Sequence, residues 1–144
     1  MTRIEHGFNS NSLIRDYGNV EREIDICRTS AALFDFSFMT FIIIEGEKSI
    51  EAISSFSSRS ITNMNDGQIR YSLYCNKDGY IVSDITIWRI KQDKYIIMSG
   101  RAQDYNDFKK LNESFNNRDF NIEQKHLTAL SVQGPHCLRN LVHH

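Results

Sequence analysis

Asp84 is the side chain whose type and position in the sequence most clearly suggest chemistry. It stands in the middle of the run IVSDITIW, whose β-branched residues are typical of a strand, where aspartate is disfavoured. One interpretation is a carboxylate on the solvent side of a half-exposed strand. The other is a carboxylate that lines a ligand cleft and takes part in proton transfer. The residue alone leaves both interpretations open.

The short motifs of other common chemistries are absent from the sequence. It has no GxxxxGK(S/T) phosphate-binding loop, no HExxH metal motif and no GxSxG nucleophile elbow. The remaining potential ligands do not stand at metal-ligand spacing; these are His6, His126, His136, Cys27, Cys75 and Cys137. We therefore predict no metal site, and three free thiols in a reducing compartment.

A β-hairpin is the element that must position Asp84. Residues 69–76 and 80–90 are two strand-like runs, and the turn-forming residues 76–79 (NKDG) join them. Side chains alternate between the two faces of a strand, so Asp84 is expected on one face and the apolar residues Ile85 and Ile87 on the other. Trp88 shares the face of Asp84, where it forms either a stacking wall or part of the core.

The other elements follow from the periodicity of the apolar residues. Helical spacing predicts helices over residues 19–32, 47–56 and 102–115, and a short last helix from Gly134-Pro135 to near Val142. Strands are predicted over residues 39–45, 94–98, 120–123 and 127–132. The polar run 54–67 is predicted to be a surface loop, and the charges between residues 101 and 110 a solvated helix face. This order indicates an α+β fold with a mainly antiparallel sheet and flanking helices.

The composition is that of a compact domain. Hydrophobic residues make up 40% of the 144 residues and charged residues 24%, with a formal net charge of -1. This balance argues against a nucleic-acid-binding protein or a polybasic membrane-surface protein. The first residues lack the apolar core of a signal peptide, and no apolar run suffices for a membrane span. We expect a cytoplasmic single domain over residues 1–144, and we interpret residues 143–144 (HH) as the remnant of an expression tag.

Three ordered motifs resemble the aminomethyltransferase family, which includes the glycine-cleavage T-protein and the folate domains of dimethylglycine and sarcosine dehydrogenases and oxidases. Residues 23–39 (EIDICRTSAALFDFSFM) resemble its first signature, and residues 71–86 (YSLYCNKDGYIVSDIT) are similar to its hairpin. Residues 130–135 (LSVQGP) match its Gln-Gly-Pro element. Together the motifs cover about residues 23–141, which makes the resemblance specific.

The resemblance implies a folate-binding fold, with tetrahydrofolate taking up a one-carbon unit from a small amine or methyl donor. In this family an aspartate on the second strand of the hairpin lies near the reactive folate nitrogen, and Asp84 is the only candidate for this catalytic role here, since the aspartate credited in T-proteins aligns with Ser83. The resemblance also implies folate contacts at Met39, Tyr71, Ser83, Asp84 and Ser99. The chain also departs from the family pattern. T-proteins carry two successive aspartates where this chain has Ser83-Asp84, a pair closer to the dimethylglycine-type enzymes. Their asparagine after the third strand falls on Met98, and their histidine before the motif methionine is Phe38.

The length of the chain leaves the function open, because members of this family are more than twice as long. One hypothesis is a tetrahydrofolate-dependent aminomethyltransferase of one-carbon metabolism, of the glycine-cleavage T-protein type. Another is a non-catalytic folate-fold subunit or binding module of a larger amine oxidase or transferase complex. The third is a relative that keeps the fold without a folate site. A second copy of the chain or a partner subunit is expected to complete the cleft.

Overall fold

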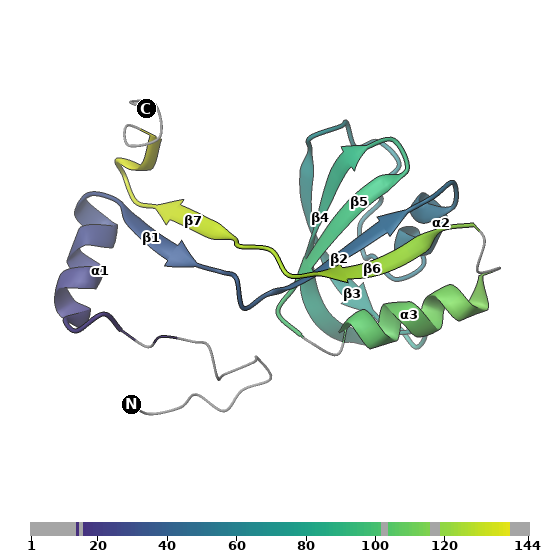
Figure 1. Ribbon diagram of the computed structural model, residues 1–144, viewed down its shortest axis with the longest axis horizontal. Helices are drawn as coiled ribbons and strands as arrows, with labels where there is room; N and C mark the ends of the chain where they lie inside the picture. Colours follow the sequence, from purple (N-terminus) through teal and green to yellow (C-terminus); the bar gives the residue numbers. More distant parts are fainter. Residues whose placement is uncertain (1–13, 15, 102–103, 116–118, 139–144) are drawn as a thin grey trace. The chain divides into compact units, whose positions relative to one another are not determined.

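The computed structural model describes residue 14 and residues 16–101, 104–115 and 119–138 (Figure 1). The chain divides into two compact units. The first combines Met1–Phe38 with Leu127–His144, and the second is Met39–His126. The single-domain expectation stays a prediction, and each unit is described by itself.

A five-stranded antiparallel sheet forms the centre of the second unit. Its strands follow the order β3-β4-β5-β2-β6. Their bounds are Ile69–Cys75 for β3, Ile81–Lys91 for β4, Lys94–Ser99 for β5, Thr40–Glu45 for β2 and Asn121–Lys125 for β6. The hairpin of β3 and β4 is the one that the turn residues predict. The mainly antiparallel α+β class is thus confirmed.

Two helices cover one face of this sheet, which we call the inner face. They are α2, Ser49–Ser54, and α3, Asp104–Ser114. Ile53 of α2 and Phe108 of α3 belong to one buried cluster with Ile85, Ile87 and Ile97 of the strands. The alternation predicted for β4 is therefore confirmed, because Ile85 and Ile87 are fully buried on this face.

The loop between α2 and β3 is more than a surface connection. Phe56, Ile61 and Met64 are at most 5% exposed and belong to the core cluster. The polar composition of residues 54–67 correctly predicts a loop, but the prediction that it lies on the surface is wrong at these three positions. The three apolar side chains pack into the core because their burial is favourable, whereas most of the polar residues between them face water.

The main elements of the first unit, among its described residues, are helix α1 and a two-stranded ribbon. Helix α1, Val20–Thr29, begins where the Asn19 side chain accepts a hydrogen bond from the Arg22 N–H at 3.0 Å. Strand β1, Ala32–Asp35, pairs antiparallel with β7, Leu130–Gln133. The sequence predicts β7 but not β1. Of the predicted last helix, Cys137 and Leu138 are helical, and the rest lies outside the described residues.

Gly134 explains why the Gln-Gly-Pro element needs a glycine. Its φ is +127°, and a Cβ there would lie 2.8 Å from the Cys27 carbonyl oxygen and closer still to that of Ser30. These atoms belong to the backbone at the end of α1, so they cannot move aside as a flexible side chain can. The glycine therefore lets the chain after β7 approach the end of α1.

We expect Gly134→Ala to lower the free energy of unfolding by about 2 kcal/mol or more, measured by urea denaturation. Gly18→Ala is the matched control, because Gly18 also has a positive φ of +114° but no atom within 4 Å of its Cβ position. The difference between the two variants measures the close approach to α1. Equal losses of stability in the two variants would show that the close approach of residue 134 to α1 makes no contribution.

No helix in the described part of the chain is long and apolar enough to cross a membrane.

Candidate functional site

Asp84 lies on the outer face of the sheet, which is the face turned away from α2 and α3. Val82, Thr86 and Trp88 share this face with it, because they alternate with the buried residues of β4. The Asp84 side chain is exposed, and Trp88 is half-buried, with its Nε1–H donating to Thr86 Oγ1 at 2.8 Å. The neighbouring strands add mainly apolar side chains to this face, among them Ile69, Ile96 and Met98.

Tyr71 is the polar neighbour of Asp84 on the outer face. It lies on β3 opposite Thr86, and its phenol O–H donates to Asp84 Oδ2 at 3.4 Å. Desolvation raises the pKa of the Tyr71 phenol, and the nearby negative charge and hydrogen bond of Asp84 raise it further. Tyr71 is nevertheless 53% exposed. The pair therefore presents a carboxylate and a phenol to a ligand from solvent.

We expect Asp84→Asn to lower the pKa of Tyr71. The substitution removes the negative charge that disfavours the phenolate, while the desolvation remains, so the pKa falls only part of the way to its ordinary value. An NMR titration of the Tyr71 ring measures this change. Asp78→Asn, in the turn of the same hairpin, is the control. A Tyr71 pKa that is equal in Asp84→Asn and the wild type would contradict the contact.

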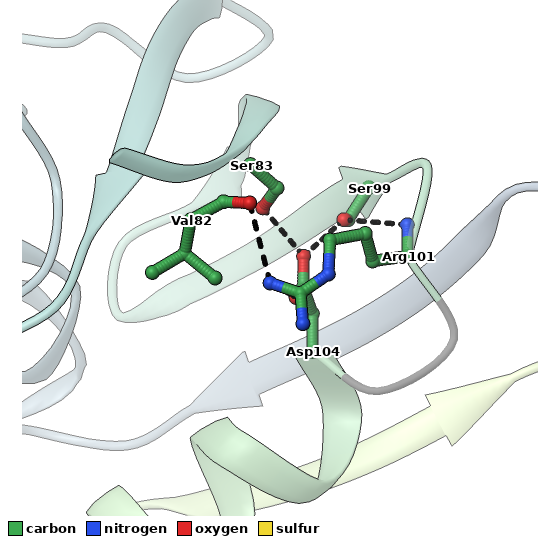
Figure 2. Close-up of polar contacts among 5 residues, drawn as sticks. All are labelled: Val82, Ser83, Ser99, Arg101 and Asp104. Carbon is green, nitrogen blue, oxygen red and sulfur yellow. Dashed lines mark hydrogen bonds and ion pairs between the residues drawn. The ribbon is translucent and has the colours of Figure 1, made fainter. Parts of the chain in front are cut away.

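The other two predicted hydroxyls meet on the inner face. Ser83 Oγ donates to Asp104 Oδ2 at 2.7 Å, and Ser99 Oγ donates to the same oxygen (Figure 2). Asp104 is the first residue of α3 and is completely buried. Its negative charge is favourable at the N-terminus of a helix, and the two hydroxyl donors compensate for its loss of water.

Arg101 completes this cluster. Its Nη1 lies 3.3 Å from Asp104 Oδ1 and donates to the Val82 carbonyl oxygen at 3.2 Å. Its backbone N–H donates to Ser99 Oγ at 3.1 Å. Figure 2 shows the guanidinium between the start of β4 and the start of α3. We call Ser83, Ser99, Arg101 and Asp104 the inner cluster.

The structure thus separates the residues predicted to contact folate. Asp84 and Tyr71 meet on the outer face, whereas Ser83 and Ser99 bind Asp104 on the inner face. Met39 is half-buried directly before β2. None of these positions has been tested for ligand contact, so their binding roles stay predictions.

Asp104 is the residue that the sequence analysis missed. The charges between residues 101 and 110 were expected on a solvated helix face, and for Asp104 this expectation is wrong because it is fully buried. Its spacing contains a usable signal: Asp104 stands four residues before Phe108, which is also fully buried, and so lies on the same side of the helix. An aspartate on the apolar side of a helix start indicates partners on the sheet below.

A concave surface lies within the first unit, between α1 and β1. This groove has a volume of about 760 Å³. Val20 and Ile24 of α1 are about half exposed beside it, and Leu33 of β1 is 60% exposed. Its lining contains two acidic side chains, Glu23 and Asp35, and one basic side chain, Arg28. Within the described part of the first unit, no residue of α1 is buried.

Comparison with known proteins confirms the resemblance that the motifs indicate. The model of the GCVT N-terminal domain matches residues 8–143. An aminomethyltransferase of Thermosipho melanesiensis is 28% identical over 130 residues, and one of Pseudothermotoga lettingae is 30% identical over 124 residues. The glycine cleavage system aminomethyltransferase T of Bartonella henselae has a similar structure, with a TM-score of 0.75 and 25% sequence identity.

These matches cover most of this chain but a smaller part of each relative. The alignments span 87% and 83% of the chain for the two sequences, and 83% for the structure. They span 35%, 33% and 33% of the respective relatives. The chain therefore corresponds to about a third of the length of the aminomethyltransferases that it matches.

Proposed function

The chain belongs to the family of GCVT N-terminal domains, and from that premise we propose that it binds tetrahydrofolate and takes part in the transfer of an aminomethyl-derived one-carbon unit to it. Asp84 is the catalytic residue in this proposal. The observation that carries it is the exposed Asp84–Tyr71 pair, which lies beside apolar side chains on the outer face of the sheet.

The outer face has the chemistry that a reduced pterin requires. A pterin is a flat ring system with N–H donors along its edge, so it needs an apolar surface and a hydrogen-bond acceptor. Ile69 and Tyr71 are both more than half exposed on this face, and the Asp84 carboxylate that contacts Tyr71 is an acceptor. Charge-assisted hydrogen bonds of this kind are roughly twice as strong as neutral ones.

The residues of the chain have separate roles in this proposal. When bound, tetrahydrofolate supplies the nitrogen nucleophile that takes up the one-carbon unit. Asp84 accepts a hydrogen bond or a proton from that nitrogen and stabilises positive charge nearby. Tyr71 fixes the direction of the carboxylate by donating to Oδ2. Met39, Ser83 and Ser99 remain proposed folate contacts from the resemblance, and the donor is a small amine or methyl compound.

Anaerobic calorimetric titration with tetrahydrofolate tests the proposal. We expect micromolar binding or tighter, and weaker binding of oxidised folic acid, whose ring lacks the N–H groups of the reduced pterin next to Asp84. Absence of heat, together with no change in the thermal midpoint at millimolar tetrahydrofolate, would overturn the proposal. An assay for one-carbon transfer from a formaldehyde or amine donor then separates an enzyme from a binding protein.

One observation favours the second candidate, a non-catalytic subunit or module that a further polypeptide completes. The groove between α1 and β1 leaves apolar side chains exposed, which is typical of surfaces that bind a partner. In this case tetrahydrofolate binds but no donor is turned over by the chain alone. A cytoplasmic location suits both candidates, since Cys27, Cys75 and Cys137 are all free thiols.

A further inference from the structure

The part of β4 that carries Asp84 is paired with a strand on one side only. Pairing between β4 and β5 starts at Ile85, which lies opposite Ser99, the last residue of β5. Residues 81–84 therefore have no strand partner on that side within the described chain. On the other side Asp84 pairs with Leu73 and Ser83 with Tyr74, and the register with β3 shifts after that pair, between Tyr74 and Cys75, where Ile81 is the next partner. A strand end of this kind is weakly restrained by its ladder.

The inner cluster supplies the missing restraint. Asp104 holds the Ser83 hydroxyl at 2.7 Å, and Arg101 holds the Val82 carbonyl oxygen at 3.2 Å. These are the two residues directly before Asp84. Arg101 and Asp104 are in turn joined to each other and to Ser99, where β5 ends. The start of α3 thus takes the place of a neighbouring strand along this part of β4 (Figure 2).

We propose that Asp104 is a positioning residue that sets the direction of the Asp84 side chain through Ser83. Adjacent residues of a strand point to opposite faces, so fixing Ser83 on the inner face fixes the peptide plane from which Asp84 projects on the outer face. Asp104 itself is fully buried and is therefore not accessible from solvent. Its consequence for folate rests on the proposed function, whereas its effect on Asp84 does not.

The test uses Tyr71 as a reporter of where Asp84 points. Its phenol pKa is raised partly by Asp84, so it falls when the carboxylate moves away. We expect Asp104→Ala and Ser83→Ala to lower this pKa in the direction given by Asp84→Asn. Asp104→Asn keeps one acceptor for the serines and is expected to stay closer to the wild type. Tetrahydrofolate affinity should fall by about tenfold in the alanine variants, as for one lost hydrogen bond to a charged group.

Two controls separate positioning from a merely structural role. Ile53→Val, on the buried side of α2, lowers the thermal midpoint without changing a hydrogen-bond partner of Ser83 or Asp84, and Asp107→Asn removes the other acidic charge of the first turn of α3. Both are expected to leave the Tyr71 titration unchanged. If Asp104→Ala does not fold, Ser83→Ala removes the same hydrogen bond between positions 83 and 104 with a smaller change of side chain.

The outcomes distinguish this inference from the proposed function. A lowered Tyr71 pKa in Ser83→Ala and Asp104→Ala supports positioning, even when the wild type binds no tetrahydrofolate and the proposed function fails. A Tyr71 pKa that stays at its wild-type value in both variants, while Asp84→Asn lowers it, would overturn the inference and leave Asp104 a structural residue only.

Discussion

Asp84→Asn is expected to slow one-carbon transfer to tetrahydrofolate by about 10²–10⁴-fold, the range typical of a lost general acid or base. Asparagine keeps the size of the side chain and one acceptor, but it can neither take up a proton nor stabilise positive charge as a carboxylate does. The free energy of unfolding should stay within about 0.5 kcal/mol of the wild type, because the Asp84 side chain is exposed. Activity and stability therefore separate in this variant.

Initial transfer rates measured anaerobically against tetrahydrofolate concentration provide the test. A loss in kcat with little change in KM indicates a role in the chemical step, and a change in KM alone indicates a role in binding. Asp78→Asn is the matched control, since Asp78 is an exposed aspartate in the turn of the same hairpin. An unchanged rate in Asp84→Asn would remove Asp84 from the mechanism.

The sequence predicts most of the second unit because its apolar periodicity is regular. Alternation along β4 places Ile85 and Ile87 in the core, and helical spacing predicts Phe108 on the packed side of α3. The Asn76 to Gly79 turn predicts the hairpin without tertiary information. Local patterns therefore suffice where each element buries one clear face.

Elements whose structure depends on distant partners could not be predicted in this way. Strand β1 is only four residues long, which is too short for its apolar residues to distinguish a strand from the end of the preceding helix. It becomes a strand by pairing with β7, which lies about a hundred residues later in the chain. The buried side chains Phe56, Ile61 and Met64 stand in a run whose polar neighbours conceal them. In both cases tertiary contacts override the local pattern.

The residues of the candidate site also differ in whether the local sequence predicts them. Asp84 stands out in the sequence because aspartate is rare inside a strand of β-branched residues. The inner cluster does not, because Ser83 and Asp104 are 21 residues apart and meet only when α3 folds onto the sheet. The resemblance groups Ser83 and Ser99 with Asp84, but it cannot indicate that their hydroxyls are already engaged on the opposite face.

Ser83→Asp, which introduces the two successive aspartates of the T-proteins, is expected to lower the free energy of unfolding by about 3 kcal/mol or more. Ser83 Oγ lies 2.7 Å from the buried Asp104 carboxylate, so the substitution replaces a hydrogen-bond donor by a second negative charge. Two carboxylates that share a buried site cannot both ionise. The loss should be larger at about pH 7 than at about pH 4, where protonation relieves the repulsion.

The exchange of the two side chains identifies the cause of this loss. Ser83→Asp combined with Asp104→Ser restores one carboxylate and one hydroxyl to this pair, with the two side chains exchanged between β4 and α3. If charge repulsion with Asp104 is the cause, this double variant recovers much of the stability that Ser83→Asp loses, as measured by urea denaturation at both pH values. Ser83→Thr keeps the hydroxyl and controls for added volume. A double variant no more stable than Ser83→Asp would contradict this, because steric strain at position 83 would then outweigh the charge. Recovery would instead show that an aspartate at position 83, as in the T-proteins, is compatible with this fold only when the first residue of α3 is not an acid.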